Sequence, residues 1–108
     1  MNCNNILHNE RIEIAVLGTL VWACQNGKTN IPHDEGLTKE LFYTPQNATI
    51  FGVISDIIAA GKTPDQITIS EKVKAEGISE IMPADVIVRT EWYPGQEVNF
   101  EEHVRILR

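Results

Sequence analysis

Two Gly-Lys-Thr triplets, at positions 27–29 and 61–63, are the segments of this sequence that come nearest to a catalytic motif. A phosphate-binding loop also needs a glycine five residues before the glycine of the triplet, and it must join a strand to a helix. Those earlier positions hold Trp22 and Asp56, and each triplet follows a predicted helix. We therefore interpret both triplets as the ends of helices.

The other reactive side chains do not form a recognisable site. The three histidines lack the spacing of metal ligands. Asp34 and Glu35 are neighbours, an arrangement that does not direct two carboxylates at one reacting atom. Cys3 and Cys24 have no metal or redox spacing, which is typical of free thiols in a reducing cytoplasm. The sequence thus predicts no enzyme activity, no cofactor or metal site, and a cytoplasmic location.

Length and charge limit the protein further. A chain of 108 residues with 43% hydrophobic residues is sufficient for one globular domain. A net charge of −6 disfavours binding to phosphate backbones, so we expect no direct contact with nucleic acid. The apolar run at 14–24 is too short to span a membrane, and no signal peptide is visible.

The segment 42–68 is the centre of the predicted fold. Thr44 is a suitable N-cap, Pro45 suits the first helical position, and Gly61 can adopt the left-handed conformation that ends a helix. The residues between them repeat at helical spacing and predict one strongly apolar helix. Thr68 and Glu71 resemble a capping box that begins the next helix, ending near Gly77. We expect neighbouring helices to cover the apolar one.

The remaining segments also favour helices. We expect residues 1–9 to be frayed, with Asn9 capping a central helix over 10–25 in which Gly18 admits a close neighbour. The segment 28–41 is predicted to be a polar connector, anchored by Ile31 and Leu37, with a short helix between Pro32 and Gly36. For 83–91, Pro83 and Asp85 favour a helix although Val86, Ile87 and Val88 would suit a strand. Asn99 should cap a last helix.

These elements predict an all-α fold, a single orthogonal bundle of about five or six helices over residues 10–108. The expected core consists of the apolar residues that share the inner faces of these helices. They are Val16, Leu17, Leu20, Phe42, Ile50, Phe51, Ile54, Ile57, Ile58, Val73, Phe100, Val104 and Leu107.

In their order and spacing, these segments resemble the N-terminal domain of DnaB-family replicative DNA helicases. The family's Glu-x-Ala-Val-Leu-Gly corresponds to 13–18, its Leu-x-x-x-x-Phe-Tyr-x-Pro-x-His-x-x-Ile-Phe to 37–51, and its Gly-x-x-x-Asp-x-x-Thr to 61–68. Asn47 replaces the histidine, and 79–91 replaces the family's Gly-Gly-x-x-Tyr-Leu element. The matching residues include Glu13, Leu17, Gly18, Phe42, Tyr43, Pro45, Ile50, Phe51, Gly61, Asp65, Thr68 and Asn99.

The resemblance implies a non-catalytic, all-helical domain of a longer helicase. It implies that the parent protein continues through a helical hairpin, whose first arm would contain Arg108, to a motor domain that uses ATP and Mg to unwind DNA. It further implies primase and other helicase protomers as partners. Because the hairpin pairs in the family, we expect this chain by itself to be a monomer or a dimer that dissociates at about tens of micromolar or above.

Two alternative functions, and the role of one residue, remain open. A stand-alone or phage-borne adaptor would have the same fold and another partner. In a helix-turn-helix DNA-binding protein, residues 65–79 would precede a recognition helix. The segment that follows them has the acidic residues Glu80 and Asp85, and Pro83, but no lysine or arginine before Arg89, so it would repel DNA. Asp65 either bonds the free N–H groups at the start of the following helix or contacts a partner directly.

Overall fold

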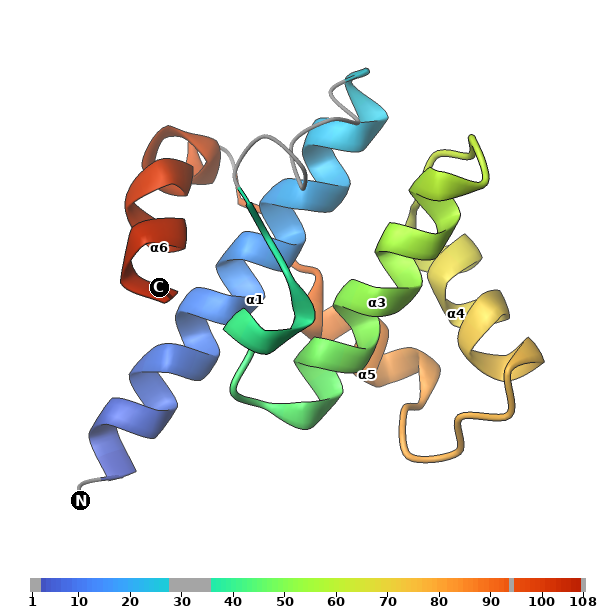
Figure 1. Cartoon of the computed structure of the whole chain (residues 1–108), viewed down its shortest axis with the longest axis horizontal. Coiled ribbons are helices and arrows are strands. Elements are labelled where there is room, and N and C mark those ends of the chain that lie inside the picture. Colours follow the sequence, from blue (N-terminus) through green and yellow to red (C-terminus); the bar gives the residue numbers. More distant parts are fainter. Residues whose placement is uncertain (1–2, 28–35, 94, 108) are drawn as a thin grey trace.

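In the computed structural model, residues 3–27, 36–93 and 95–107 can be described, with side chains from Glu10 onward. Within these ranges the fold is all-helical, with five α-helices, two short 3-10 helices and no strand (Figure 1). This confirms the predicted fold class. The elements are α1 (Cys3–Gln25), η1 (Lys39–Leu41), α3 (Pro45–Ala59), α4 (Gln66–Ala75), α5 (Pro83–Arg89), η2 (Gln96–Asn99) and α6 (Phe100–Leu107).

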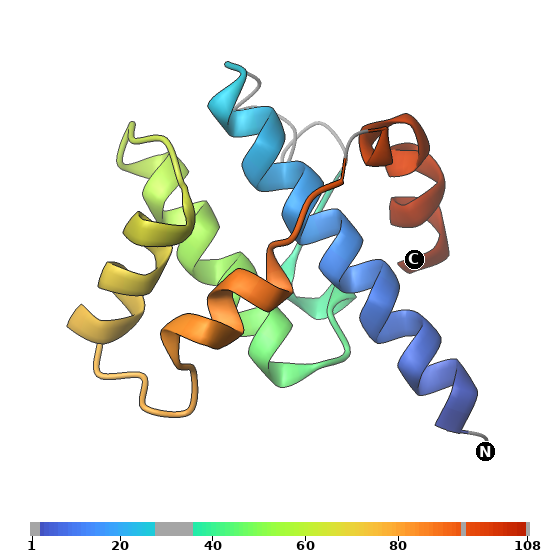
Figure 2. The same ribbon diagram turned by 180° about the vertical axis from the view of Figure 1, so that it is seen from behind.

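Helix α1 runs through the middle of the molecule, with α6 on one side and α3, α4 and α5 on the other (Figure 1). After α5 the chain passes along α1 to η2, as the rear view shows (Figure 2). It passes so close that a Cβ atom on Gly18 would overlap the carbonyl group of Glu91. Gly18 therefore admits a close neighbour, as expected, and that neighbour is backbone.

The start of α1 differs from the prediction. The helix begins at Cys3, so the backbone of 3–9 continues α1 and Asn9 lies inside the helix instead of capping it. The physical reason is that extending an existing helix avoids the cost of nucleation, and no Gly or Pro interrupts this segment. The proposed short helix between Pro32 and Gly36, and the anchor Ile31, fall mostly or wholly in 28–35, outside the described residues.

Helix α3 has the predicted ends. Thr44 is the N-cap and Pro45 the first residue, although the Thr44 side chain makes no capping bond. At the other end, Gly61 has φ of +78° and its N–H donates to Ile58 O at 2.9 Å, while Lys62 N–H donates to Ile57 O at 3.1 Å. This pair of bonds is the Schellman arrangement that satisfies the last carbonyl groups of a helix.

Helix α4 begins earlier than predicted. Its N-cap is Asp65, whose carboxylate accepts a bond from Thr68 N–H at 2.7 Å, and the Thr68 hydroxyl accepts one from Asp65 N–H at 2.8 Å. Thr68 is thus the third helical residue of a capping box, and Glu71 is not its partner. A carboxylate is a strong cap at the positive end of a helix, which explains why the helix starts directly after Asp65.

The predictions for the last two α-helices, α5 and α6, have different outcomes. Helix α5 forms despite its β-branched residues, because Pro83 occupies its first position and the Asp85 carboxylate accepts a bond from Met82 N–H at 2.8 Å. The prediction that Asn99 caps the last helix is wrong. Asn99 is exposed and ends η2, which runs directly into α6, so the chain is already helical before Phe100.

Eleven of the thirteen predicted core residues are buried, and Ile58 and Leu107 are partly buried at the edge of the core. Leu37 is also buried, as expected for an anchor of the connector. The core additionally takes in residues that the prediction omitted, among them Ile12, Val21, Cys24, Val53, Ile69, Ile81 and Val86. In the described ranges, no helix is both long and apolar enough to cross a membrane.

Candidate protein-docking surface

The most connected polar group in the interior is the carboxylate of Glu13 on α1, which is fully buried. Its two oxygens accept bonds from the backbone N–H of Tyr43 at 2.7 Å, from the backbone N–H of Thr44 at 3.2 Å, and from the side-chain amide of Asn47 at 2.9 Å. A buried carboxylate is tolerated when its oxygens are satisfied in this way. Glu13 therefore fixes the segment that leads into α3 to the middle of α1.

The network continues to α5 through Arg89. Its guanidinium donates to Asn47 Oδ1 and Gln46 Oε1, both at 2.9 Å, and lies 3.6 Å from a carboxylate oxygen of Glu10. Helices α1, α3 and α5 are thus joined by one chain of charged and amide groups. In the sequence, the only indication of this network is Glu13, an acidic residue within an otherwise apolar helical face. Its partners could not be identified from the sequence because they lie 30 or more residues away.

The residues that carry the family resemblance lie in four places. Glu13, Phe42, Tyr43 and Pro45 meet at the start of α3, where the Phe42 ring also stacks on Phe51 at 5.0 Å. Leu17, Gly18 and Ile50 are buried in the core, whereas Tyr43 is 69% exposed. Gly61, Asp65 and Thr68 form the turn into α4, and Asn99 lies apart beside α6.

A first surface feature, which we call the Trp cleft, lies between α1 and the start of α4. It is a cavity of about 360 Å³ in which Asp65, Gln66 and Ile67 face the end of α1. Trp22 and Trp92 stack with ring centroids 5.2 Å apart and planes 8° from parallel. The other lining residues are Gly18, Val21, Gln25 and Thr90. Stacked aromatic rings in a hollow are typical of the anchoring positions of protein interfaces.

A second feature is the α4–α5 groove, a hollow of about 460 Å³. The two helices run antiparallel, because Gln66 at the start of α4 donates to Thr90 Oγ1 at 3.2 Å, just after the end of α5. Apolar side chains form most of the groove, and Glu71 and Lys74 stand at its rim. Its lining consists of Ser70, Glu71, Val73, Lys74, Ile78, Ser79, Ile81, Met82, Pro83 and Val86.

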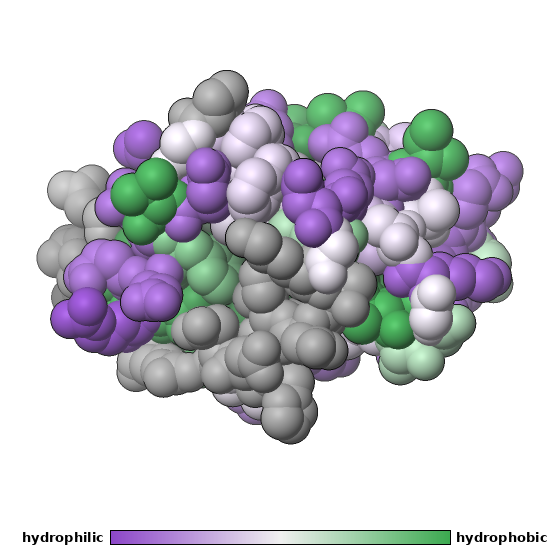
Figure 3. Space-filling model, turned by 90° about the horizontal axis from the view of Figure 1, so that it is seen from above, coloured by the Kyte–Doolittle hydropathy of each residue, from purple (hydrophilic) through white to green (hydrophobic). Residues whose placement is uncertain are grey.

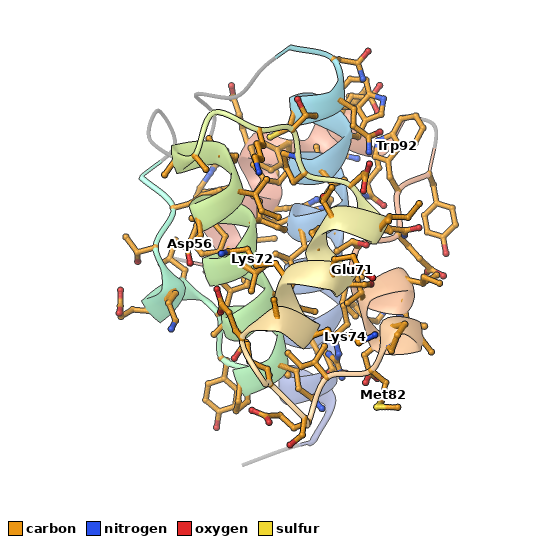
Figure 4. The ribbon with its side chains drawn as sticks, turned by 90° about the vertical axis from the view of Figure 1, so that its right-hand side faces the viewer. Asp56, Glu71, Lys72, Lys74, Met82 and Trp92 are labelled. Atoms are coloured by element: carbon orange, nitrogen blue, oxygen red, sulfur yellow. The ribbon has the colours of Figure 1, made fainter. Side chains whose placement is uncertain are left out.

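Four exposed apolar side chains lie on these two helices or next to them. Ile67, Met82, Ile87 and Val88 are each 51% to 73% exposed, whereas Tyr43, Tyr93, Val98 and Ile106 are exposed elsewhere on the molecule. In Figure 4, Glu71 and Lys74 project from α4 on the side of α5, while Lys72 lies on the flank toward α3. By contrast, the hydrophobic areas at the end of the molecule shown in Figure 3 are separated by hydrophilic ones among the described residues.

The charged and reactive groups near these surfaces are ordinary for a protein exterior. Lys72 and Glu76 form a 3.0 Å ion pair whose hydrogen bond raises the pKa of Lys72. Burial raises the pKa of the Cys24 thiol, so it is a poor nucleophile. In the described part of the chain, no three His, Cys, Asp or Glu residues lie together in a way that could hold a metal ion.

The geometry of α4 and α5 does not suit DNA reading. The connector from Glu76 to Met82 is longer than the three or four residues of a helix-turn-helix. Arg89, the one basic residue of α5, is engaged with Gln46 and Asn47 and is not free for a base edge. Apolar side chains, with Ile87 and Val88 among them, occupy the exposed face of α5.

Comparison with known proteins gives one family. A family model described as the DnaB-like helicase N terminal domain matches residues 5–108, nearly the whole chain. No curated protein and no solved structure gives a significant match.

Proposed function

The chain belongs to the family of DnaB-like helicase N-terminal domains, and from this premise we propose that it is the primase-docking domain of a replicative DNA helicase. It also serves to assemble helicase protomers. The domain itself is non-catalytic, and the parent protein would supply the ATP- and Mg-dependent motor that unwinds DNA. Primase and neighbouring protomers are its partners.

The observation that supports docking is the hollow beside the start of α4, where exposed Ile67 lies next to two stacked, partly exposed tryptophans. Stable partners usually anchor on a few apolar or aromatic residues beside a hollow, with polar residues around them. The Trp cleft has this character, with Trp22 and Trp92 stacked, Ile67 exposed and Asp65 at its edge. A docking protein needs such a surface and no catalytic group.

Asp65 offers a sharp test, because its structural role and a docking role can be separated. One oxygen of its carboxylate accepts the Thr68 N–H bond, so the Asp65→Asn side chain would keep an acceptor for that bond while losing the negative charge. The exposed Asp56 on α3 supplies a matched control, Asp56→Asn, which removes the same charge away from the cleft.

The experiment is isothermal titration calorimetry of this chain with the primase of the same organism. We expect micromolar or tighter binding by the wild-type chain, binding at least about tenfold weaker for Asp65→Asn, and no change for Asp56→Asn. Thermal unfolding should show all three proteins to be folded. Absence of wild-type binding would overturn primase docking and favour an adaptor with another partner. Equal binding by both variants would move the docking site away from Asp65.

A further inference from the structure

We propose that the Trp cleft recognises an arginine side chain of the partner protein. This inference rests on the proposed function, because it names the chemistry of the group that enters the docking site. The cleft has a volume of about 360 Å³, at the small end of the roughly 300–1,000 Å³ that ligand pockets occupy. It therefore suits one long side chain and not a whole helix.

The charge of the cleft is negative. Asp65 is the only charged residue among the described residues that line it. The whole chain has a net charge of −6, and the field of these charges acts in the same direction as the Asp65 carboxylate. A positively charged occupant is therefore attracted to the cleft, whereas an acidic one is repelled.

The polar groups that the cleft offers to a partner are hydrogen-bond acceptors. One oxygen of the Asp65 carboxylate accepts the Thr68 N–H bond at 2.7 Å, and the other oxygen makes no bond within the described part of the chain. The side-chain nitrogen of Gln66 donates to Thr90 Oγ1 at 3.2 Å and to Ile87 O at 3.4 Å, which leaves the Gln66 side-chain oxygen as an acceptor. A matching occupant must bring several N–H donors.

The aromatic wall of the cleft favours arginine among the cations. Trp22 and Trp92 line the cleft, are partly exposed and stack with their rings nearly parallel. Trp92 Nε1 is buried, so this donor is not presented to an incoming cation. Tryptophan attracts cations more strongly than the other aromatic residues. The guanidinium of arginine is planar, weakly hydrated and rich in N–H donors, whereas the ammonium of lysine is compact and strongly hydrated.

An apolar anchor would fit the same cleft less well. It would cover the carboxylate of Asp65 and the side-chain oxygen of Gln66 without bringing a donor, and covered acceptors without a donor reduce affinity. The exposed Ile67 side chain at the edge of the cleft is compatible with arginine, because long basic side chains lay their methylene stems along apolar surface.

The direct test is a titration of this chain with N-acetyl-arginine amide, followed through the indole N–H signals in proton–nitrogen NMR spectra. Trp22 and Trp92 are the two tryptophans of the sequence, so these signals report on the cleft. We expect saturable shifts with a dissociation constant on the order of a few millimolar. N-acetyl-citrulline amide has the same shape without the charge and should bind at least about tenfold more weakly, and N-acetyl-lysine amide at least about threefold more weakly.

Two variants connect this binding to the carboxylate. Asp65→Asn should weaken binding of the arginine probe at least about fivefold, and Asp56→Asn, away from the cleft, should leave it unchanged. Circular dichroism checks that both variants are folded. The inference is wrong if the arginine and citrulline probes bind equally, if Asp65→Asn binds the arginine probe as well as the wild type, or if no saturation occurs up to about 100 mM.

Competition connects the cleft to the partner. In a calorimetric titration with primase at constant ionic strength, the arginine probe at ten times its dissociation constant should weaken primase binding about tenfold, while the citrulline probe should not. Primase binding that the arginine probe leaves unchanged would overturn the inference and leave the proposed function standing. Arginine binding in the cleft without any primase binding would refute primase docking alone.

Discussion

Glu13 shows what one buried charge contributes to this fold. Its carboxylate is on α1, yet the groups that it satisfies are at the start of α3: two backbone N–H groups and the amide of Asn47. Without the carboxylate these three donors would lose their acceptor, and a buried donor without an acceptor costs about 1–3 kcal/mol. The side chain therefore anchors the entry to α3 on α1, and the Asn47 side chain, which it holds, accepts a bond from Arg89.

Glu13→Ala should lower the free energy of unfolding by about 3–5 kcal/mol, because it leaves the buried amide of Asn47 and the partly buried N–H groups of Tyr43 and Thr44 without their acceptor. Urea denaturation followed by circular dichroism measures this. Glu102→Ala is the control, since Glu102 makes only an exposed pair with Arg105 and should change stability by less than about 0.5 kcal/mol. A loss below about 1 kcal/mol for Glu13→Ala would show that water replaces the carboxylate.

At the scale of elements, the closest packing involves α1 and the chain that follows α5. Gly18 faces the carbonyl group of Glu91 so closely that a methyl group has no room, and the obstacle is backbone, which cannot rotate away. Gly52 on α3 is also inside a helix, but a Cβ there would meet only the Lys39 side chain, at an ordinary 3.5 Å. Of these two helical glycines, Gly18 is thus required by the packing, whereas Gly52 leaves room for a side chain.

Gly18→Ala should destabilise the protein by about 1–3 kcal/mol, since the overlap with Glu91 outweighs the gain in helix propensity. Gly52→Ala should instead stabilise it by up to about 1 kcal/mol, because the propensity gain is unopposed. Thermal and urea unfolding of the two variants side by side provides the measurement. Equal effects of the two substitutions would mean that α1 can move away from residue 91.

The whole molecule has one continuous core. Every described α-helix contributes buried hydrophobic residues to a single cluster. The Cα radius of gyration, 13.0 Å, is the value expected for one compact domain of about this length. Since α1 contacts α3, α5 and α6, no described helix can separate from the rest without exposing part of the cluster.

Unfolding should therefore be a single cooperative transition. Far-UV circular dichroism reports helix content, and fluorescence of the stacked Trp22 and Trp92 reports the packing of α1 against the segment after α5. The two probes should give coincident urea midpoints, as expected for two-state unfolding of a small domain. A fluorescence midpoint well below that of the circular dichroism would indicate that the residue 90–99 segment detaches before the helices melt.

Local chemistry within a few residues was sufficient to predict much of the fold. Pro45 and Gly61 bound α3, Gly77 follows α4, and Pro83 with Asp85 begins α5, because each acts through hydrogen bonds or backbone preferences that span at most one helical turn. The helical period likewise revealed most of the core, and the spacing of motif residues revealed the family.

Only the tertiary structure decided the features that join distant segments. The partners of Glu13, the stacking of Trp22 on Trp92, and the contact of Gly18 with Glu91 link residues 30 to 73 positions apart, between which no local pattern exists. The same holds for the candidate docking surface. The sequence singled out Asp65, but the Trp cleft and the α4–α5 groove arise from how α1, α4 and α5 pack, because exposure depends on which faces the neighbouring helices leave uncovered.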